Sequence, residues 1–155
     1  MNEEWAQNYV INKLKSLGFQ AERIDPTDSA IDLEVVGENN FKIRVKFNIN
    51  QKIEFGGAKP KQSLSDSDFM VILIPENPNI IFDENNLLVL ILPAPLVRKC
   101  AKHISDSYAQ DYLAKNNTKP EDYIPNINFN DPAIWQQEVK NWLLRYKDNW
   151  EILGK

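Results

Sequence analysis

Two runs of consecutive apolar residues, 69–74 and 87–92, constrain the fold of this chain more than any other feature. The first run is rich in β-branched residues, and neither run alternates between apolar and polar side chains. A strand with this pattern presents apolar side chains on both faces, so other elements must cover both. Each run is far too short to cross a membrane as a helix. We therefore expect two buried strands in a sheet that has helices on its faces.

Helical periodicity is found on either side of these runs. Residues 2–17 repeat apolar side chains at helical spacing, and Gly18 directly after them is a typical helix end. A second helix, opened by prolines, is expected at about 95–113. The chain end predicts a helix that Asp131 caps, with one apolar stripe made of Trp135, Val139, Trp142, Leu143, Tyr146 and Trp150. This spacing favours packing of the stripe in the core over base stacking or a dimer face.

Short alternating segments predict three strands before the apolar runs. Residues 19–24 predict one strand, and 30–36 with 41–48 predict a hairpin. The connecting segments predict a turn at 25–28, a loop at 56–60, a short helical turn at 62–65, an exposed loop at 77–86 and an extended surface segment at 116–130. The whole order indicates an α/β (α+β) fold with a mixed sheet, and 155 residues suffice for a single domain over 1–155.

Charge excludes a uniformly basic nucleic-acid binder, because 22 acidic against 18 basic residues give a net charge of −4. The segment 42–61 differs, since it carries six basic residues and one acidic residue. Cys100 is the only cysteine, so an internal disulfide is excluded. With His103 it makes two metal-type ligands, too few for a zinc site. The first residues have neither the basic start nor the apolar run of a signal peptide, which predicts a cytoplasmic protein without a membrane segment.

The hairpin is the most informative stretch of the sequence. Alternation places Asp32 and Glu34 on one face of the first strand, and it places Arg44 and Lys46 on one face of the second. A three-residue loop at 38–40 would set Asp32 opposite Lys46 and Glu34 opposite Arg44. The sequence therefore predicts one charged face and one apolar face for this hairpin.

Several motifs resemble the PD-(D/E)xK nuclease-like superfamily, and within it a small bacterial branch. They are Glu-Glu-Trp-Ala-Gln at 3–7, Leu-Gly-Phe at 17–19, Ser-Ala-Ile-Asp-Leu at 29–33, Ile-Arg-Val-Lys-Phe at 43–47 and Ser-Asp-Phe at 67–69. The resemblance covers about 3–92. It implies a restriction-endonuclease-like αβββαβ core, with 93–155 as a C-terminal helical extension.

The resemblance also implies a site. Asp32 matches the aspartate that binds Mg²⁺ or Mn²⁺ in this superfamily, and Lys46 matches the lysine that positions or activates water. Gln7 stands where a helix acid is common, with Glu3 one turn away. Arg44 departs from the pattern, because a Glu or Gln ligand is usual there and a guanidinium supplies only donors and positive charge. Glu34 shares the Asp32 face and is the candidate replacement ligand.

Three interpretations stay open at this point. The first is a metal-dependent DNA nuclease that uses Asp32, Glu34 and Lys46, supported by Glu3 or Gln7. The second keeps the fold without the metal, as a DNA-binding module or as an interaction or oligomeric protein that associates through the C-terminal helix. The third treats the charged residues as cross-strand ion pairs. For DNA binding, the candidate backbone contacts are Arg44, Lys52, Lys59 and Lys61.

Overall fold

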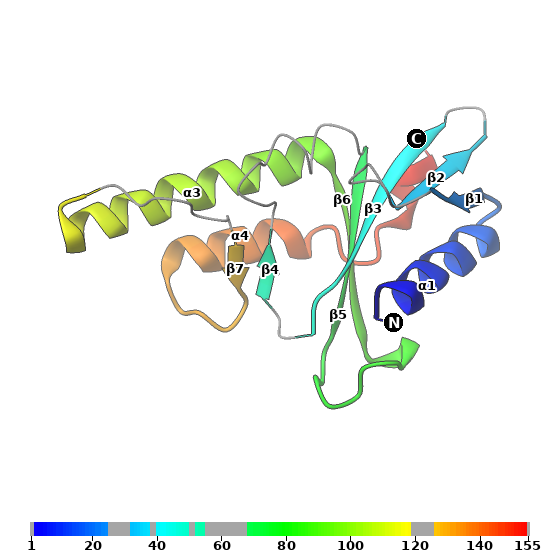
Figure 1. Ribbon diagram of the computed structural model, residues 1–155, viewed down its shortest axis with the longest axis horizontal. Helices are drawn as coiled ribbons and strands as arrows, with labels where there is room; N and C mark the ends of the chain where they lie inside the picture. Colours follow the sequence, from blue (N-terminus) through cyan, green and yellow to red (C-terminus); the bar gives the residue numbers. More distant parts are fainter. Residues whose placement is uncertain are drawn as a thin grey trace.

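The computed structural model describes residues 2–24, 32–37, 40–49, 52–54, 68–118 and 126–154. Its elements, in chain order, are α1 (Asn2–Ser16), β1 (Gln20–Arg23), β2 (Leu33–Val36), β3 (Phe41–Phe47), β4 (Lys52–Glu54), β5 (Phe69–Pro75), η1 (Glu84–Asn86), β6 (Leu87–Pro93), α3 (Ala94–Asn116), β7 (Asn126–Asn128), α4 (Ile134–Leu144) and η2 (Trp150–Gly154) (Figure 1). The turn predicted at 25–28, the loop at 56–60 and the helical turn at 62–65 lie outside the described residues. No helix in the described parts is long and apolar enough to cross a membrane.

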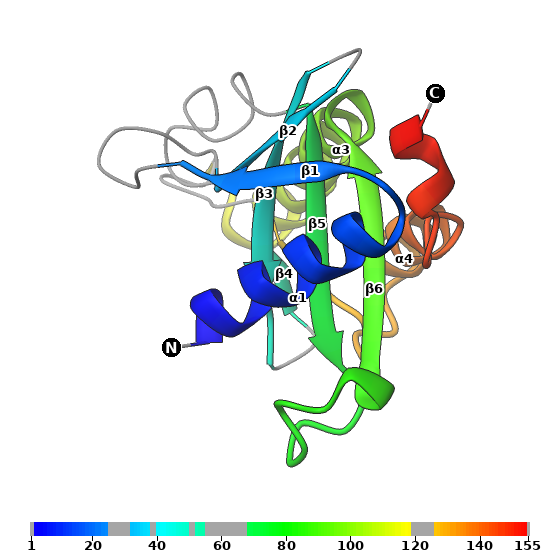
Figure 2. The same ribbon diagram turned by 90° about the vertical axis from the view of Figure 1, so that its right-hand side faces the viewer.

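Five strands form the central sheet in the order β1-β2-β3-β5-β6. The β3–β5 pair is parallel and the other three pairs are antiparallel, so the sheet is mixed, as predicted. Helix α1 crosses one face, while α3 and α4 lie behind the other (Figure 2). This α/β layering confirms the fold class that the sequence indicates.

Strand β5 shows why its sequence is apolar throughout. Val71 and Leu73 point into the core cluster that contains α1, whereas Met70 and Ile72 point into the cluster that contains α3 and α4. All four side chains are at most 1% exposed. The prediction of a strand covered on both faces is therefore confirmed.

Helix α1 ends within one residue of the predicted position. Glu3 and Glu4 occupy its first turn, where negative charge suits the helix dipole. Gly18 follows the helix with a φ of +92°, a backbone conformation that an L side chain rarely adopts. The N–H of Phe19 then bonds to the carbonyl of Leu14 at 2.9 Å, which turns the chain back toward β1.

The C-terminal helix is shorter than predicted. It ends at Leu144 because the following residues pair with the outer edge of β6, where Ile91 N–H donates to the Tyr146 carbonyl and Asp148 N–H donates to the Val89 carbonyl. Trp150 then packs in the α1-side core, on the opposite face of the sheet from Trp142. The expectation of one continuous stripe from Trp135 to Trp150 is wrong. After Leu144 the backbone bonds to the edge strand β6 and does not continue the helix.

A second, two-stranded sheet joins β4 to β7, with Ile53 opposite Ile127. Both side chains are fully buried against α3 and α4. The prediction of an extended surface segment at 116–130 is therefore wrong for 126–128, which form this small strand. The only sequence signal of this small sheet is an isoleucine between polar neighbours in each of its strands.

Candidate functional site

Asp32 lies directly before β2 and is held by backbone and side-chain hydrogen bonds. Its N–H donates to the Ile43 carbonyl at 3.0 Å, and its carbonyl accepts from Ile24 N–H at 3.1 Å. Its carboxylate accepts from the Val45 N–H at 2.7 Å through Oδ2 and from Gln7 Nε2 at 3.4 Å through Oδ1. The half-buried carboxylate therefore lies where α1 and β3 meet the start of β2.

Three charged side chains also act on the Asp32 carboxyl. Burial raises the pKa of Asp32 above its ordinary value, and the charge of Glu3 raises it further. The Val45 hydrogen bond and the positive charges of Arg44 and Lys46 lower it. Asp32 and Lys46, the two residues that match the superfamily motif, therefore lie in one environment with Gln7, Glu3 and Arg44.

The register of the hairpin differs from the predicted one by two residues. Leu33 pairs with Ile43 and Glu34 pairs with Lys42, and the ladder ends at Leu33, since the Asp32 N–H donates to the Ile43 carbonyl as well. The expected pairs Asp32–Lys46 and Glu34–Arg44 are wrong. The loop is longer than the expected three residues, and Asn40 Oδ1 closes it by accepting from Gly37 N–H at 3.0 Å. An even shift leaves the paired side chains of β2 and β3 on their predicted faces.

Glu34 lies one strand repeat farther along β2. Its cross-strand neighbours are Lys42 on β3 and Glu22 on β1. Lys42 is exposed and Glu34 is half-buried, which makes this a surface pair on the charged face of the hairpin. The role of Glu34 as a replacement ligand for Asp32 stays a prediction.

The donor set around Asp32 does not fit a divalent ion. Mg²⁺ requires several oxygen ligands in near-octahedral geometry. Two of the three charged groups that act on Asp32 are cations, Arg44 and Lys46, and Gln7 presents its amide nitrogen. Across the described residues, no three His, Cys, Asp or Glu side chains form a group that could hold a metal ion. The Mg²⁺ or Mn²⁺ site therefore remains an expectation from the resemblance alone.

The predicted backbone-binding residues are only partly described. Arg44 is half-buried on β3, and Lys52 is exposed at the start of β4. Lys59 and Lys61 lie outside the described residues. Their roles in DNA contact stay predictions.

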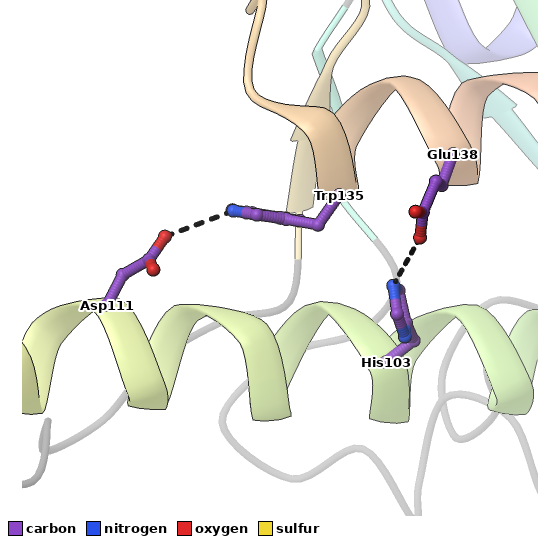
Figure 3. Close-up of polar contacts among 4 residues, drawn as sticks. All are labelled: His103, Asp111, Trp135 and Glu138. Carbon is purple, nitrogen blue, oxygen red and sulfur yellow. Dashed lines mark hydrogen bonds and ion pairs between the residues drawn. The ribbon is translucent and has the colours of Figure 1, made fainter.

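The second cluster considered in the sequence, Cys100 with His103, separates in space. Cys100 is fully buried in the core on α3, and burial raises the pKa of its thiol to about 11. The His103 ring faces α4 instead, with Nε2 3.5 Å from Glu138 Oε2, and Trp135 Nε1 donates to Asp111 Oδ2 at 3.1 Å nearby (Figure 3). These contacts join α3 to α4 and give no metal centre.

A cavity of about 660 Å³ lies apart from the Asp32 site. Aromatic and proline side chains line much of it, including Phe19, Phe41 and Pro93, together with the carboxylate residue Asp68. Asp68 Oδ2 accepts from the Lys42 N–H at 2.9 Å. None of the predicted site residues that are described lines this cavity. Its lining includes residues of two motifs from the sequence, Gly18 and Phe19 of the motif at 17–19 and Asp68 of the motif at 67–69.

The element order and the mixed sheet define a restriction-endonuclease-like fold. The same fold is found in a bacterial homing endonuclease, I-Ssp6803I, at a TM-score of 0.58 and 13% identity, over 97% of this chain and 88% of that chain. A Holliday junction resolvase, Hjc of Archaeoglobus fulgidus, overlaps at a TM-score of 0.44 and 14% identity, over 59% of this chain and 71% of that chain. No protein-family model and no curated protein matches the sequence. The nuclease-like fold is therefore confirmed.

Proposed function

We propose that this chain is a DNA-binding protein built on the nuclease-like fold, and that its Asp32 site contacts the DNA backbone. One observation carries the proposal: Arg44 and Lys46 lie on the same strand beside Asp32 and Gln7, in a fold shared with a homing endonuclease. Arginine and lysine are the residues that most often bind phosphate oxygens. The contact would be local, because the chain as a whole carries a net charge of −4.

Binding is better supported than metal-dependent cleavage. In the cleavage mechanism expected from the superfamily, Asp32 and Glu34 would hold Mg²⁺ or Mn²⁺ and Lys46 would act on water. Glu34 instead faces Lys42, and the charges that act on the Asp32 carboxyl include that of Arg44. Arginine and lysine side chains can bind phosphate oxygens without a metal ion.

The test is a DNA titration followed by fluorescence anisotropy at several salt concentrations. Lys46→Ala should weaken binding about tenfold and lower the slope of log K against log salt by about one, because one phosphate contact is lost. Lys15→Ala is the matched control, since Lys15 is an exposed lysine in the last turn of α1. The proposal is wrong if the wild type binds no DNA, or if both variants bind as the wild type does. Incubation of plasmid DNA with Mn²⁺ tests cleavage in parallel.

Self-association is a second candidate function, favoured by a different surface. The distal part of α3 projects past the central sheet (Figure 1), and none of its residues after Ile104 is buried. Leu113 on this part is 44% exposed, and Ile134 at the start of α4 is 79% exposed. Trp142, in contrast, lies against His103 and Lys99 within the same chain. An oligomer would therefore use Leu113 and Ile134 rather than the aromatic residues of α4.

Sedimentation velocity tests this second candidate. A wild-type dimer that Ile134→Ser and Leu113→Ser convert to a monomer would support it. A monomer at all concentrations would exclude it.

A further inference from the structure

The cavity of about 660 Å³ lies at one end of the central sheet, where β3 and β5 begin and β6 ends. Residues from two separate segments meet there, Gly18 and Phe19 directly after α1, and Asp68 and Phe69 where β5 begins. The chain end adds a further wall through Leu153 of η2, which lies in red at the same end of the sheet as the β2–β3 hairpin (Figures 1 and 2). The volume is within the range of about 300–1,000 Å³ that is typical of pockets for small organic ligands.

Three phenylalanine rings from three separate segments form an aromatic wall of this cavity. The Phe41 ring meets the Phe19 ring edge-on, with centroids 6.0 Å apart, and it meets the Phe69 ring in the same way at 5.5 Å. Edge-to-face contacts of this kind favour one relative orientation of the rings. Val36 extends the apolar lining toward the outside, since its side chain is 38% exposed. An apolar group that enters the cavity would therefore be removed from water.

Asp68 supplies the only charged side chain among the described residues that line the cavity. Its backbone is held on both sides, because its N–H donates to the Lys42 carbonyl and its carbonyl accepts from the Ala94 N–H, both at 2.9 Å. Its carboxylate Oδ2 also accepts from the Lys42 N–H at 2.9 Å. A carboxylate has lone pairs for several hydrogen bonds, so it can accept from a further N–H donor. The cavity therefore combines an apolar wall with a negative charge in a fixed position.

This combination selects a ligand by its charge and by its shape. A carboxylate repels an anion, and it binds an ammonium group through a charge-assisted hydrogen bond. Asp68 is exposed, so an ammonium group bound to it would keep part of its hydration while the aromatic wall covers the apolar part of the ligand. The arrangement matches a compact organic cation, in which an apolar body carries one protonated nitrogen.

We propose that this cavity binds an apolar organic cation, with the protonated nitrogen at the Asp68 carboxylate and the apolar body against the rings of Phe19, Phe41 and Phe69. A free aromatic amine and a lysine side chain of a partner polypeptide both have this chemistry. The site is separate from Asp32, and its occupation requires neither DNA nor a metal ion. The proposal is therefore independent of the DNA-binding function proposed above.

Three probes of similar shape test the charge preference, namely phenethylammonium, the neutral phenethyl alcohol and the anion hydrocinnamate. Each is titrated into the wild-type protein at constant ionic strength and followed by ¹H–¹⁵N NMR. Ligands of this size bind with millimolar dissociation constants. The cation should bind at least about fivefold more tightly than the alcohol, and the anion should bind more weakly than both. The shifted amides should include those of Gly18, Gly37 and Phe69, which line the cavity.

Two variants separate the effect of the charge from that of the cavity. Asp68→Asn removes the charge and keeps an acceptor for the Lys42 N–H, so it should weaken phenethylammonium binding about fivefold and leave phenethyl alcohol binding unchanged. Gly154→Leu adds a side chain whose Cβ would lie 4.0 Å from Phe19 Cζ, so it should weaken the binding of both probes at least about threefold by filling part of the cavity. Asp83→Asn is the matched control, because Asp83 also accepts a backbone N–H but lies between β5 and β6 at the opposite end of the sheet. It should bind both probes as the wild type does.

A fourth probe, Nα-acetyl-lysine methylamide, distinguishes the two sources of the cation. Tighter binding of this probe than of phenethylammonium indicates a partner polypeptide, and the reverse indicates a free amine. The proposal is overturned if phenethylammonium does not bind, if the alcohol or the anion binds as tightly, or if Asp68→Asn binds the cation as the wild type does. Shifts confined to residues outside the cavity would overturn it as well. Circular dichroism establishes that each variant is folded, and the wild-type comparison with Gly154→Leu supplies the test if Asp68→Asn is not.

Discussion

The backbone N–H of Val45 donates a 2.7 Å hydrogen bond to Oδ2 of Asp32. In a regular antiparallel ladder such an N–H would meet a backbone carbonyl of the neighbouring strand. Here the Asp32 carboxylate accepts the hydrogen bond in place of a carbonyl. Val45, the donor, lies between Arg44 and Lys46 in the sequence of β3. The fold of the hairpin and the charge of the site therefore depend on the same residue.

Replacement of Asp32 should show this structural role. Asp32→Ala leaves the Val45 N–H without its acceptor, so the free energy of unfolding in urea should fall by about 1–3 kcal/mol. Asp32→Asn keeps an acceptor oxygen and should cost less. Glu34→Ala, on the same strand face, should change stability by less than about 0.5 kcal/mol. Equal losses in Asp32→Ala and Glu34→Ala would contradict the role of the Val45 bond.

The raised pKa of Asp32 predicts a specific pH dependence of stability. Because burial raises this pKa in the folded chain, the carboxyl stabilises the fold most when protonated. That contribution is complete below the unfolded pKa and is lost as pH rises through the folded pKa. The unfolding free energy of the wild type, relative to that of Asp32→Asn, should therefore fall as the pH rises through the folded pKa of Asp32.

Arg44→Gln should move the same transition to higher pH, because the Arg44 charge lowers the pKa of Asp32. The ¹³C shift of the Asp32 carboxyl, followed against pH, measures this directly. A midpoint that does not move in Arg44→Gln would show that Arg44 exerts no charge effect on Asp32.

Trp150 should matter more for stability than Trp135. Trp150 is 7% exposed and packs in the α1-side core, whereas Trp135 is half-buried at the start of α4. Trp150→Ala should lower the free energy of unfolding by about 3–5 kcal/mol, and Trp135→Ala by clearly less. Equal losses of unfolding free energy in the two variants would contradict the placement of Trp150 in the α1-side core.

Two glycines give a paired test of backbone conformation. Gly18 has a φ of +92°, and an added Cβ at Gly18 or at Gly37 would meet nothing within 4 Å. Gly18→Ala should therefore cost about 1–2 kcal/mol through backbone strain alone. Gly37→Ala lacks a left-handed φ and should be close to neutral. Thermal unfolding of the two variants measures the difference, and equal melting temperatures would refute it.

Alternation was sufficient to predict which hairpin side chains share a face, because the period of a strand is two residues. It did not determine the register, since that depends on how Asn40 closes the loop. Helical spacing near the chain end likewise predicted α4 but not its end at Leu144. That end is set by the unpaired edge of β6, a tertiary feature that no local pattern reports.

The candidate site was predictable to a similar depth. Asp32 and Lys46 stood out because their motif spacing resembles a known superfamily, and the structure brings both into one environment with Gln7. The hydrogen bond from the Val45 N–H to the Asp32 carboxylate was not predictable. It depends on where the β2–β3 ladder ends, and the spacing of side chains in the sequence does not determine that point.

The most direct test of DNA binding at this site is NMR titration of the protein with a short DNA duplex in EDTA. The backbone amide of Val45 and the side-chain amide of Gln7 report on the two hydrogen bonds to Asp32. Our account predicts that these resonances shift with added DNA, together with those of Arg44 and Lys46. Shifts confined to the α3 and α4 end near Leu113 and Ile134, or no shifts at all, would contradict it.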